Sequence, residues 1–135
     1  MIVIDTSALV AIVFAEPERD AFLDVLQKHQ RVLISTPTVV ETRLVVHGRR
    51  GQRAVVLLDD LLRLPPFELV APDAEQAIAA YSAFVAYGQG SGHPASLNYG
   101  DLFSYALAKV RGLPLLFKGD GFASTDIESA LEDRP

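Results

Sequence analysis

Four acidic residues of this 135-residue chain lie next to apolar segments that are expected to become strands and helices. Asp5 directly follows an apolar run, Glu41 and Asp101 lie near expected helix starts, and Asp120 follows the last apolar run. Open α/β sheets build their sites beside the carboxyl ends of their strands. Carboxylates that converge there would suit a hard cation such as Mg²⁺ or Mn²⁺, which prefers oxygen ligands.

Three of these acids also have an ordinary structural role open to them. Asp5 precedes an expected helix and fits an N-cap. Glu41 stands three residues after Thr38, and Asp101 stands three residues after Asn98, so both pairs match the capping box of a helix start. The first turn of a helix also stabilises an ionised carboxylate through the helix dipole. Capping and metal binding therefore both remain open at these positions.

The fourth acid has a competitor in Asp126. Asp120 lies between two glycines, which is typical of a turn, and Asp126 follows in a Ser-Thr-Asp sequence that fits a helix cap. Asp120 is the preferred candidate ligand because it follows an expected buried strand, and Asp126 is kept as the alternative.

Strand-like and helix-like patterns alternate along the chain. Short apolar runs predict buried strands, and longer capped segments predict helices. Strands are expected at residues 2–4, 32–34, 67–70 and 113–117, and helices at about 8–14, 17–28, 36–50, 52–63, 73–87 and 98–110, with a short strand or turn near 125–127. This alternation predicts an α/β fold with a mostly parallel sheet that helices cover on both faces.

Composition and charge narrow the class of protein. The length fits one domain over residues 1–135. The absence of cysteine excludes disulfides, thiolate metal sites and cysteine nucleophiles. The net charge of −5 argues against unspecific adhesion to nucleic acid. A cytoplasmic protein without membrane association is expected, because the sequence has no basic leader and no apolar run of membrane-spanning length.

Four blocks of the sequence resemble PIN-domain ribonucleases, especially the VapC toxins of bacterial type II toxin–antitoxin pairs. Residues 2–9 (IVIDTSAL) resemble the opening of this family, and residues 35–41 (STPTVVE) resemble its acid-bearing helix. Residues 97–108 (LNYGDLFSYALA) resemble a third block, and residues 114–122 (PLLFKGDGF), followed by TDI at 125–127, resemble the closing one. The closing block commonly has a second acid where Gly121 stands here.

This resemblance implies a three-layer α/β/α sandwich and a Mg²⁺- or Mn²⁺-dependent endoribonuclease that hydrolyses RNA phosphodiester bonds. It implies a catalytic metal site in which Asp5, Asp101 and Asp120 are direct ligands. Glu41 would contact a second metal or metal-bound water, and the number of ions stays open. Thr6 or Ser7 would form hydrogen bonds to water or phosphate beside the ligands. Asp126 would support the ligands in the same way or replace Asp120 as the fourth ligand.

The resemblance also implies three partners, namely RNA, a VapB-like antitoxin and a second copy of the chain. Arg43, His47 and Arg50 share one helical face, and Lys118 lies near Asp120. These four are candidate contacts to RNA or antitoxin, with a solvated basic surface as the plain alternative. Apolar residues on the helices that flank residues 49–51 predict a hydrophobic patch for a partner: Leu44, Val45, Val46, Val55, Val56, Leu58 and Leu61.

Two other classes of protein remain as alternatives. A haloacid-dehalogenase-like phosphoacceptor needs a second aspartate two residues after the first, where Ser7 stands. A receiver-like phosphoacceptor domain needs an acidic neighbour of Asp5 and a further aspartate after the middle strand, and neither is evident. A PIN-like module that binds RNA or a partner without cleaving is the remaining alternative, and the presence of all four acids argues against it.

Overall fold

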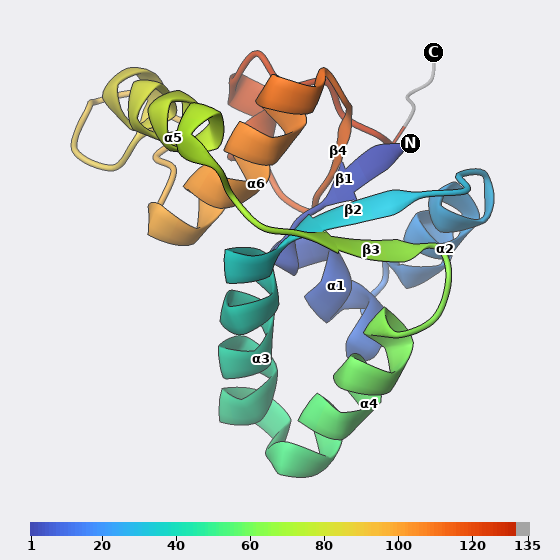
Figure 1. Cartoon of the computed structure of the whole chain (residues 1–135). Coiled ribbons are helices and arrows are strands. Elements are labelled where there is room, and N and C mark those ends of the chain that lie inside the picture. Colours follow the sequence, from blue (N-terminus) through green and yellow to red (C-terminus); the bar gives the residue numbers. More distant parts are fainter. Residues whose placement is uncertain (132–135) are drawn as a thin grey trace.

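The chain folds into three layers around a parallel sheet, and this computed structural model describes residues 1–131. The sheet order is β3-β2-β1-β4. Its strands are β1 (Ile2–Ile4), β2 (Val32–Ser35), β3 (Phe67–Val70) and β4 (Leu115–Leu116), all parallel to their neighbours. The α-helices are α1 (Thr6–Val13), α2 (Arg19–Gln27), α3 (Thr36–Arg50), α4 (Gln52–Leu62), α5 (Ala74–Tyr87) and α6 (Tyr99–Arg111). The predicted α/β/α sandwich is confirmed (Figure 1).

Alternate residues of the strands pack into two cores on opposite faces of the sheet. Ile2 and Ile4 of β1 contact the core under α1, α2, α3 and α4. Val3 points to the other face and packs with residues of α5 and α6. β1, β2 and β4 are buried throughout and are mostly apolar runs, as expected for a parallel sheet. The edge strand β3 is only partly buried and includes Glu68.

The expected helix starts near the N-terminus were misplaced by about two residues. α1 begins at Thr6 and not at Ala8, because Asp5 is its N-cap and accepts a hydrogen bond from the Ser7 amide. α2 begins at Arg19, and Pro17 lies in the turn before it.

The C-terminal strand is shorter than expected. β4 spans only two residues, and a 3₁₀ turn, η1 (Phe122–Ser124), follows it. Of the short strand or turn expected near residues 125–127, no strand forms, and the backbone bends at residues 125 and 126. The tail instead meets the sheet further on, through an isolated parallel bridge between Leu115 and Ser129.

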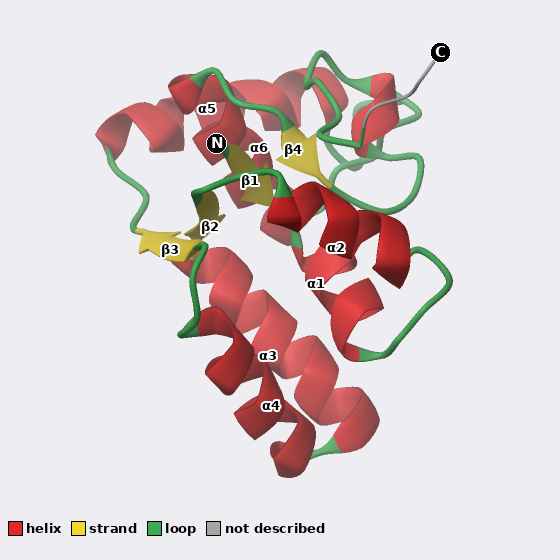
Figure 2. Cartoon of the chain, turned by 90° about the vertical axis from the view of Figure 1, so that its right-hand side faces the viewer, coloured by secondary structure: helices red, strands yellow, loops and turns green. Residues whose placement is uncertain are grey.

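Helices α3 and α4 form an adjacent pair that projects away from the sheet (Figure 2). Their connection turns at Gly51, whose φ of 78° lies in the left-handed region that glycine adopts at little cost. Within residues 1–131, no helix is long and apolar enough to cross a membrane.

Candidate active site

Asp5 lies at the carboxyl end of β1 and is almost fully buried. Its Oδ2 accepts hydrogen bonds from the Ser7 amide at 3.0 Å and the Ser7 hydroxyl at 2.8 Å. Its Oδ1 accepts a 2.6 Å hydrogen bond from the Ser104 hydroxyl of α6. These three hydrogen bonds hold the Asp5 carboxylate in one orientation at the carboxyl end of β1.

Glu41 lies in the second turn of α3, and the capping box expected with Thr38 does not form. The helix begins earlier than that pattern assumed, with Ser35 as its N-cap and Pro37 in the first turn. Thr38 is inside the helix, with its hydroxyl 3.2 Å from that of Ser104. The Glu41 carboxylate instead accepts a 2.7 Å hydrogen bond from the Thr6 hydroxyl, which leaves it directed toward the site.

Asp101 forms the capping box that its spacing predicted. The Asn98 side chain accepts from the Asp101 amide, and the Asp101 carboxylate accepts from the Asn98 amide, both at 2.9 Å. This arrangement holds Asp101 in the first turn of α6, where the positive end of the helix favours a carboxylate. The cap does not exclude a site role, because the bond to Asn98 involves only Oδ2.

Three acids share one electrostatic environment. Burial raises the pKa of Asp101 to about 6, helped by the charges of Asp5 and Glu41 and opposed by the Asn98 hydrogen bond. Burial also raises the pKa of Glu41, with a smaller contribution from Asp5, against the hydrogen bond from Thr6. Repulsion between carboxylates was expected, but burial is the larger cause. None of the three has an ion-pair partner among the described residues.

Asp101 is expected to make the metal-free protein less stable as the pH rises from about 4 to about 6. In this window the folded chain keeps a proton on Asp101, whose ordinary pKa is 3.8, and the unfolded chain has released it. Urea unfolding of the wild type and Asp101→Asn in EDTA measures this effect, since asparagine does not titrate. The stability of the wild type relative to the variant should fall across the window; a constant difference would contradict the raised pKa.

The two candidates for the fourth acid have different surroundings. Asp126 accepts hydrogen bonds from the Tyr105 hydroxyl at 2.6 Å and the Lys109 ammonium at 2.7 Å, away from the other acids. Burial alone would raise the pKa of Asp126, but these two partners outweigh it and the pKa is lowered. Asp120 is exposed, and its side chain has no partner within residues 1–131. It lies two residues beyond Lys118, whose amide donates to the Ser7 hydroxyl beside Asp5.

The candidate basic contacts are mostly engaged within the chain. Arg43 forms a two-pronged ion pair with Asp59 at 2.9 and 2.7 Å. Lys118 binds Glu16 at 2.9 Å and Glu18 at 3.3 Å. Of the remaining pair, the Arg50 guanidinium lies 4.9 Å from the ring centre of Phe14, and His47 lines a shallow hollow between α3 and α4. RNA or an antitoxin would have to compete with these contacts at Arg43 and Lys118.

Three buried hydroxyl groups beside the acids were not predicted from the sequence as part of the site: those of Thr38, Thr42 and Ser104. Ser104 donates to Asp5, so the contact between Ser104 and Thr38 is satisfied when Thr38 donates. The Thr42 hydroxyl lies 3.0 Å from that of Thr6, which in turn donates to Glu41. Their spacing was a usable signal, because Thr38 and Thr42 are four apart on α3 and Ser104 is three residues after Asp101 on α6.

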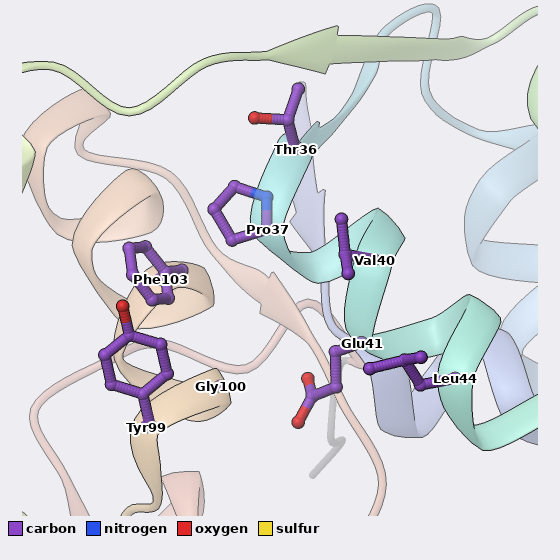
Figure 3. A pocket seen from close by; sticks show the side chains of 8 residues that line it. All are labelled: Thr36, Pro37, Val40, Glu41, Leu44, Tyr99, Gly100 and Phe103. Carbon is purple, nitrogen blue, oxygen red and sulfur yellow. The ribbon is translucent and has the colours of Figure 1, made fainter.

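An open apolar groove of about 530 Å³ runs between α3 and α6, and Glu41 is one of the residues that line it. Figure 3 shows the Glu41 carboxylate pointing into the space next to Gly100. The remaining lining is mostly apolar or aromatic: Thr36, Pro37, Val40, Leu44, Tyr99 and Phe103. Of the three acids, Glu41 therefore faces this apolar groove directly.

Comparison with known proteins identifies the family. A family model described as PIN domain matches residues 2–128. Ribonuclease VapC30 of Mycobacterium tuberculosis is 48% identical over 125 residues, which are 93% of this chain and 95% of that protein. The chain belongs to the VapC family of PIN-domain ribonucleases. Ribonuclease VapC42 of the same organism is a further VapC relative, 44% identical over 128 residues that cover 95% of this chain and 98% of that protein.

Solved VapC structures share the fold at lower sequence identity. VapC20 of Mycobacterium tuberculosis, described as a sarcin–ricin loop cleaving toxin, has a TM-score of 0.78 and 16% identity, with 94% of this chain and 96% of that chain covered. VapBC2 from Rickettsia felis, bound to a DNA fragment from its promoter, has a TM-score of 0.73 and 18% identity, with 96% of each chain covered. Membership of the VapC family removes the basis for the phosphoacceptor alternatives.

Proposed function

We propose that this chain is an endoribonuclease toxin that hydrolyses RNA phosphodiester bonds with Mg²⁺ or Mn²⁺ at Asp5, Glu41 and Asp101. One observation carries the proposal. These carboxylates come from three separate segments, influence one another electrostatically and have no ion-pair partner among residues 1–131. The names of the relatives at 44% and 48% identity, both ribonucleases, support RNA as the substrate.

The donor set fits a hard divalent cation. All three groups offer oxygen. Burial is the main cause of the raised pKa of Glu41 and of Asp101, and the charges of the neighbouring acids raise it further. In the described part of the chain, no three acidic or histidine side chains already stand close enough together to hold a metal ion. A bound ion would polarise water and phosphate and offset the charge that builds in the transition state.

Each residue has a distinct part in this proposal. Asp5, held by three hydrogen bonds, is the fixed ligand around which the others arrange. Thr6 holds the Glu41 carboxylate in place through Oε1. Asp101 must lose its proton before it binds a cation, so metal affinity should rise with pH through about 6. Asp120 completes the set as the exposed acid on the loop after β4, in preference to the ion-paired Asp126.

We further infer a VapB-like antitoxin and a second copy of the chain as partners in the cytoplasm. The support is the exposed apolar side chains on the projecting helices, including Val40, Leu44, Val56 and Leu57. Three residues that were expected in this patch are instead buried in the core: Val46, Val55 and Leu58. Solved complexes of similar fold include a toxin–antitoxin complex from Klebsiella pneumoniae. Light scattering on the purified chain, alone and co-expressed with its neighbouring operon product, measures both associations. A chain that is monomeric alone and does not co-purify with the operon product would contradict both proposed associations.

Cleavage of RNA by the purified chain tests the proposed activity. Cleavage should require Mg²⁺ or Mn²⁺, stop in EDTA and return when the ion is restored, because the carboxylates need a cation to act on phosphate. Gel analysis of a structured RNA with mapped ends would also show internal cuts. RNA binding without cleavage in either ion would favour the non-catalytic module instead.

A further inference from the structure

Gly100 lies in the first turn of α6, between the exposed Tyr99 and Asp101, and the Glu41 carboxylate points toward it (Figure 3). A side-chain carbon at position 100 would lie 2.5 Å from the carboxyl carbon of Glu41 and 2.7 Å from its Oε1, and it would overlap Oε2. These distances are too short for non-bonded atoms. The Glu41 carboxylate thus occupies the space that any side chain at position 100 would need.

The backbone gives no separate reason for glycine at this position. Gly100 is absent from the glycines with positive φ, so alanine could adopt its conformation. Alanine is also the better helix former. What glycine supplies here is space, and the space is filled by a carboxylate of the acidic site.

We propose that Gly100 is a positioning residue whose missing side chain admits the Glu41 carboxylate beside Asp101. The inference rests on the proposed ribonuclease function. Glu41 cannot move aside without loss, because its Oε1 accepts the 2.7 Å hydrogen bond from Thr6. A shift away from Gly100 would also take the carboxylate away from the first turn of α6, where Asp101 lies.

Gly100→Ala should therefore lower kcat for RNA cleavage by roughly 10- to 100-fold, since misplacing a reacting group by about 1 Å can cost ~100-fold. The melting temperature should stay the same or rise, because alanine favours the helix. Gly48→Ala is the matched control: Gly48 also lies in a helix, and a side-chain carbon there would meet nothing within 4 Å. Gly48→Ala should keep full activity, and its melting temperature should change about as little as that of Gly100→Ala.

A double-mutant cycle separates this role from a general packing effect. Adding Gly100→Ala to Glu41→Ala should cause no further loss of activity, because no carboxylate is left to collide with. Mn²⁺ affinity, measured by calorimetry without RNA, should weaken roughly 10-fold or more in Gly100→Ala, as expected when the support of a ligand is lost. The affinity should stay unchanged in Gly48→Ala.

Two results would overturn the role of Gly100. The first is that Gly100→Ala binds Mn²⁺ as tightly as the wild type and, where the wild type cleaves RNA, also cleaves it with the same kcat. The other is an equal loss with and without the Glu41 carboxylate. A wild type that binds Mn²⁺ but cuts no RNA refutes the proposed function alone, and the calorimetry then still decides whether Gly100 positions Glu41.

Discussion

Asp101→Asn is expected to lower metal-dependent RNA cleavage by at least about 100-fold without destabilising the metal-free protein. Loss of a group that merely supports a ligand costs ~10- to 100-fold, so loss of a ligand should cost at least as much. The asparagine carbonyl can still accept the hydrogen bond from the Asn98 amide, which preserves the helix cap. Removing the charge also removes repulsion from Asp5 and Glu41.

Cleavage assays and urea unfolding in EDTA together separate the site role of Asp101 from its capping role. Asp73→Asn is the matched control, because Asp73 caps α5 through a 2.9 Å hydrogen bond from the Gln76 amide and lies outside the acidic group. The control should cleave normally. If Asp101→Asn instead kept its activity and lost about 1 kcal/mol of stability, Asp101 would be only a cap.

Asp5→Asn is expected to reduce cleavage by at least about 100-fold for the same reason, with the fold retained. An asparagine at this buried position can still accept from the two donors of Ser7. Its amide can donate to Ser104, whose hydroxyl can turn toward Thr38, 3.2 Å away. The stability loss should therefore stay near about 1–2 kcal/mol. Circular dichroism and thermal unfolding check the fold beside the cleavage assay.

Asp126→Asn serves as the control for Asp5→Asn. It breaks the ion pair with Lys109, which is exposed and contributes little to stability, and it should leave cleavage intact. The opposite pattern, with an active Asp5→Asn and an inactive Asp126→Asn, would move the site to the other end of α6, where Asp126 meets Lys109. The cleavage activity of Asp120→Asn, measured in the same series, tests whether Asp120 belongs to the metal-binding set.

Much of the fold could be predicted because local pattern and tertiary packing agree. The apolar run at Ile2–Ile4 is a strand with both faces buried, and the caps at Asn98 and Asp73 begin helices where their spacing predicted. The start of α3 near residue 36 was predicted correctly, but the capping box that Thr38 and Glu41 fit does not form. Both residues lie inside the helix, whose N-cap is Ser35.

The positions of four acids in the sequence favoured one site, and Thr6 and Ser7 were expected beside them. The contact between the hydroxyls of Ser104 and Thr38 could not be predicted. Ser104 and Thr38 are 66 residues apart in sequence, and only the packing of α6 against α3 brings their hydroxyls together. The space at Gly100 depends on the same packing. Asp120 was preferred over Asp126 because it follows an apolar strand, but the partners that Asp126 finds in Tyr105 and Lys109 could not be predicted.

A crystal structure with Mn²⁺, read by anomalous scattering, tests the central claim most directly. The proposed function predicts manganese bound by oxygens of Asp5 and Asp101, with Glu41 bound directly or through water, and the same data fix the number of ions. Manganese bound only elsewhere, for example at Asp126, or no bound manganese at an ion concentration that supports cleavage, would contradict the claim.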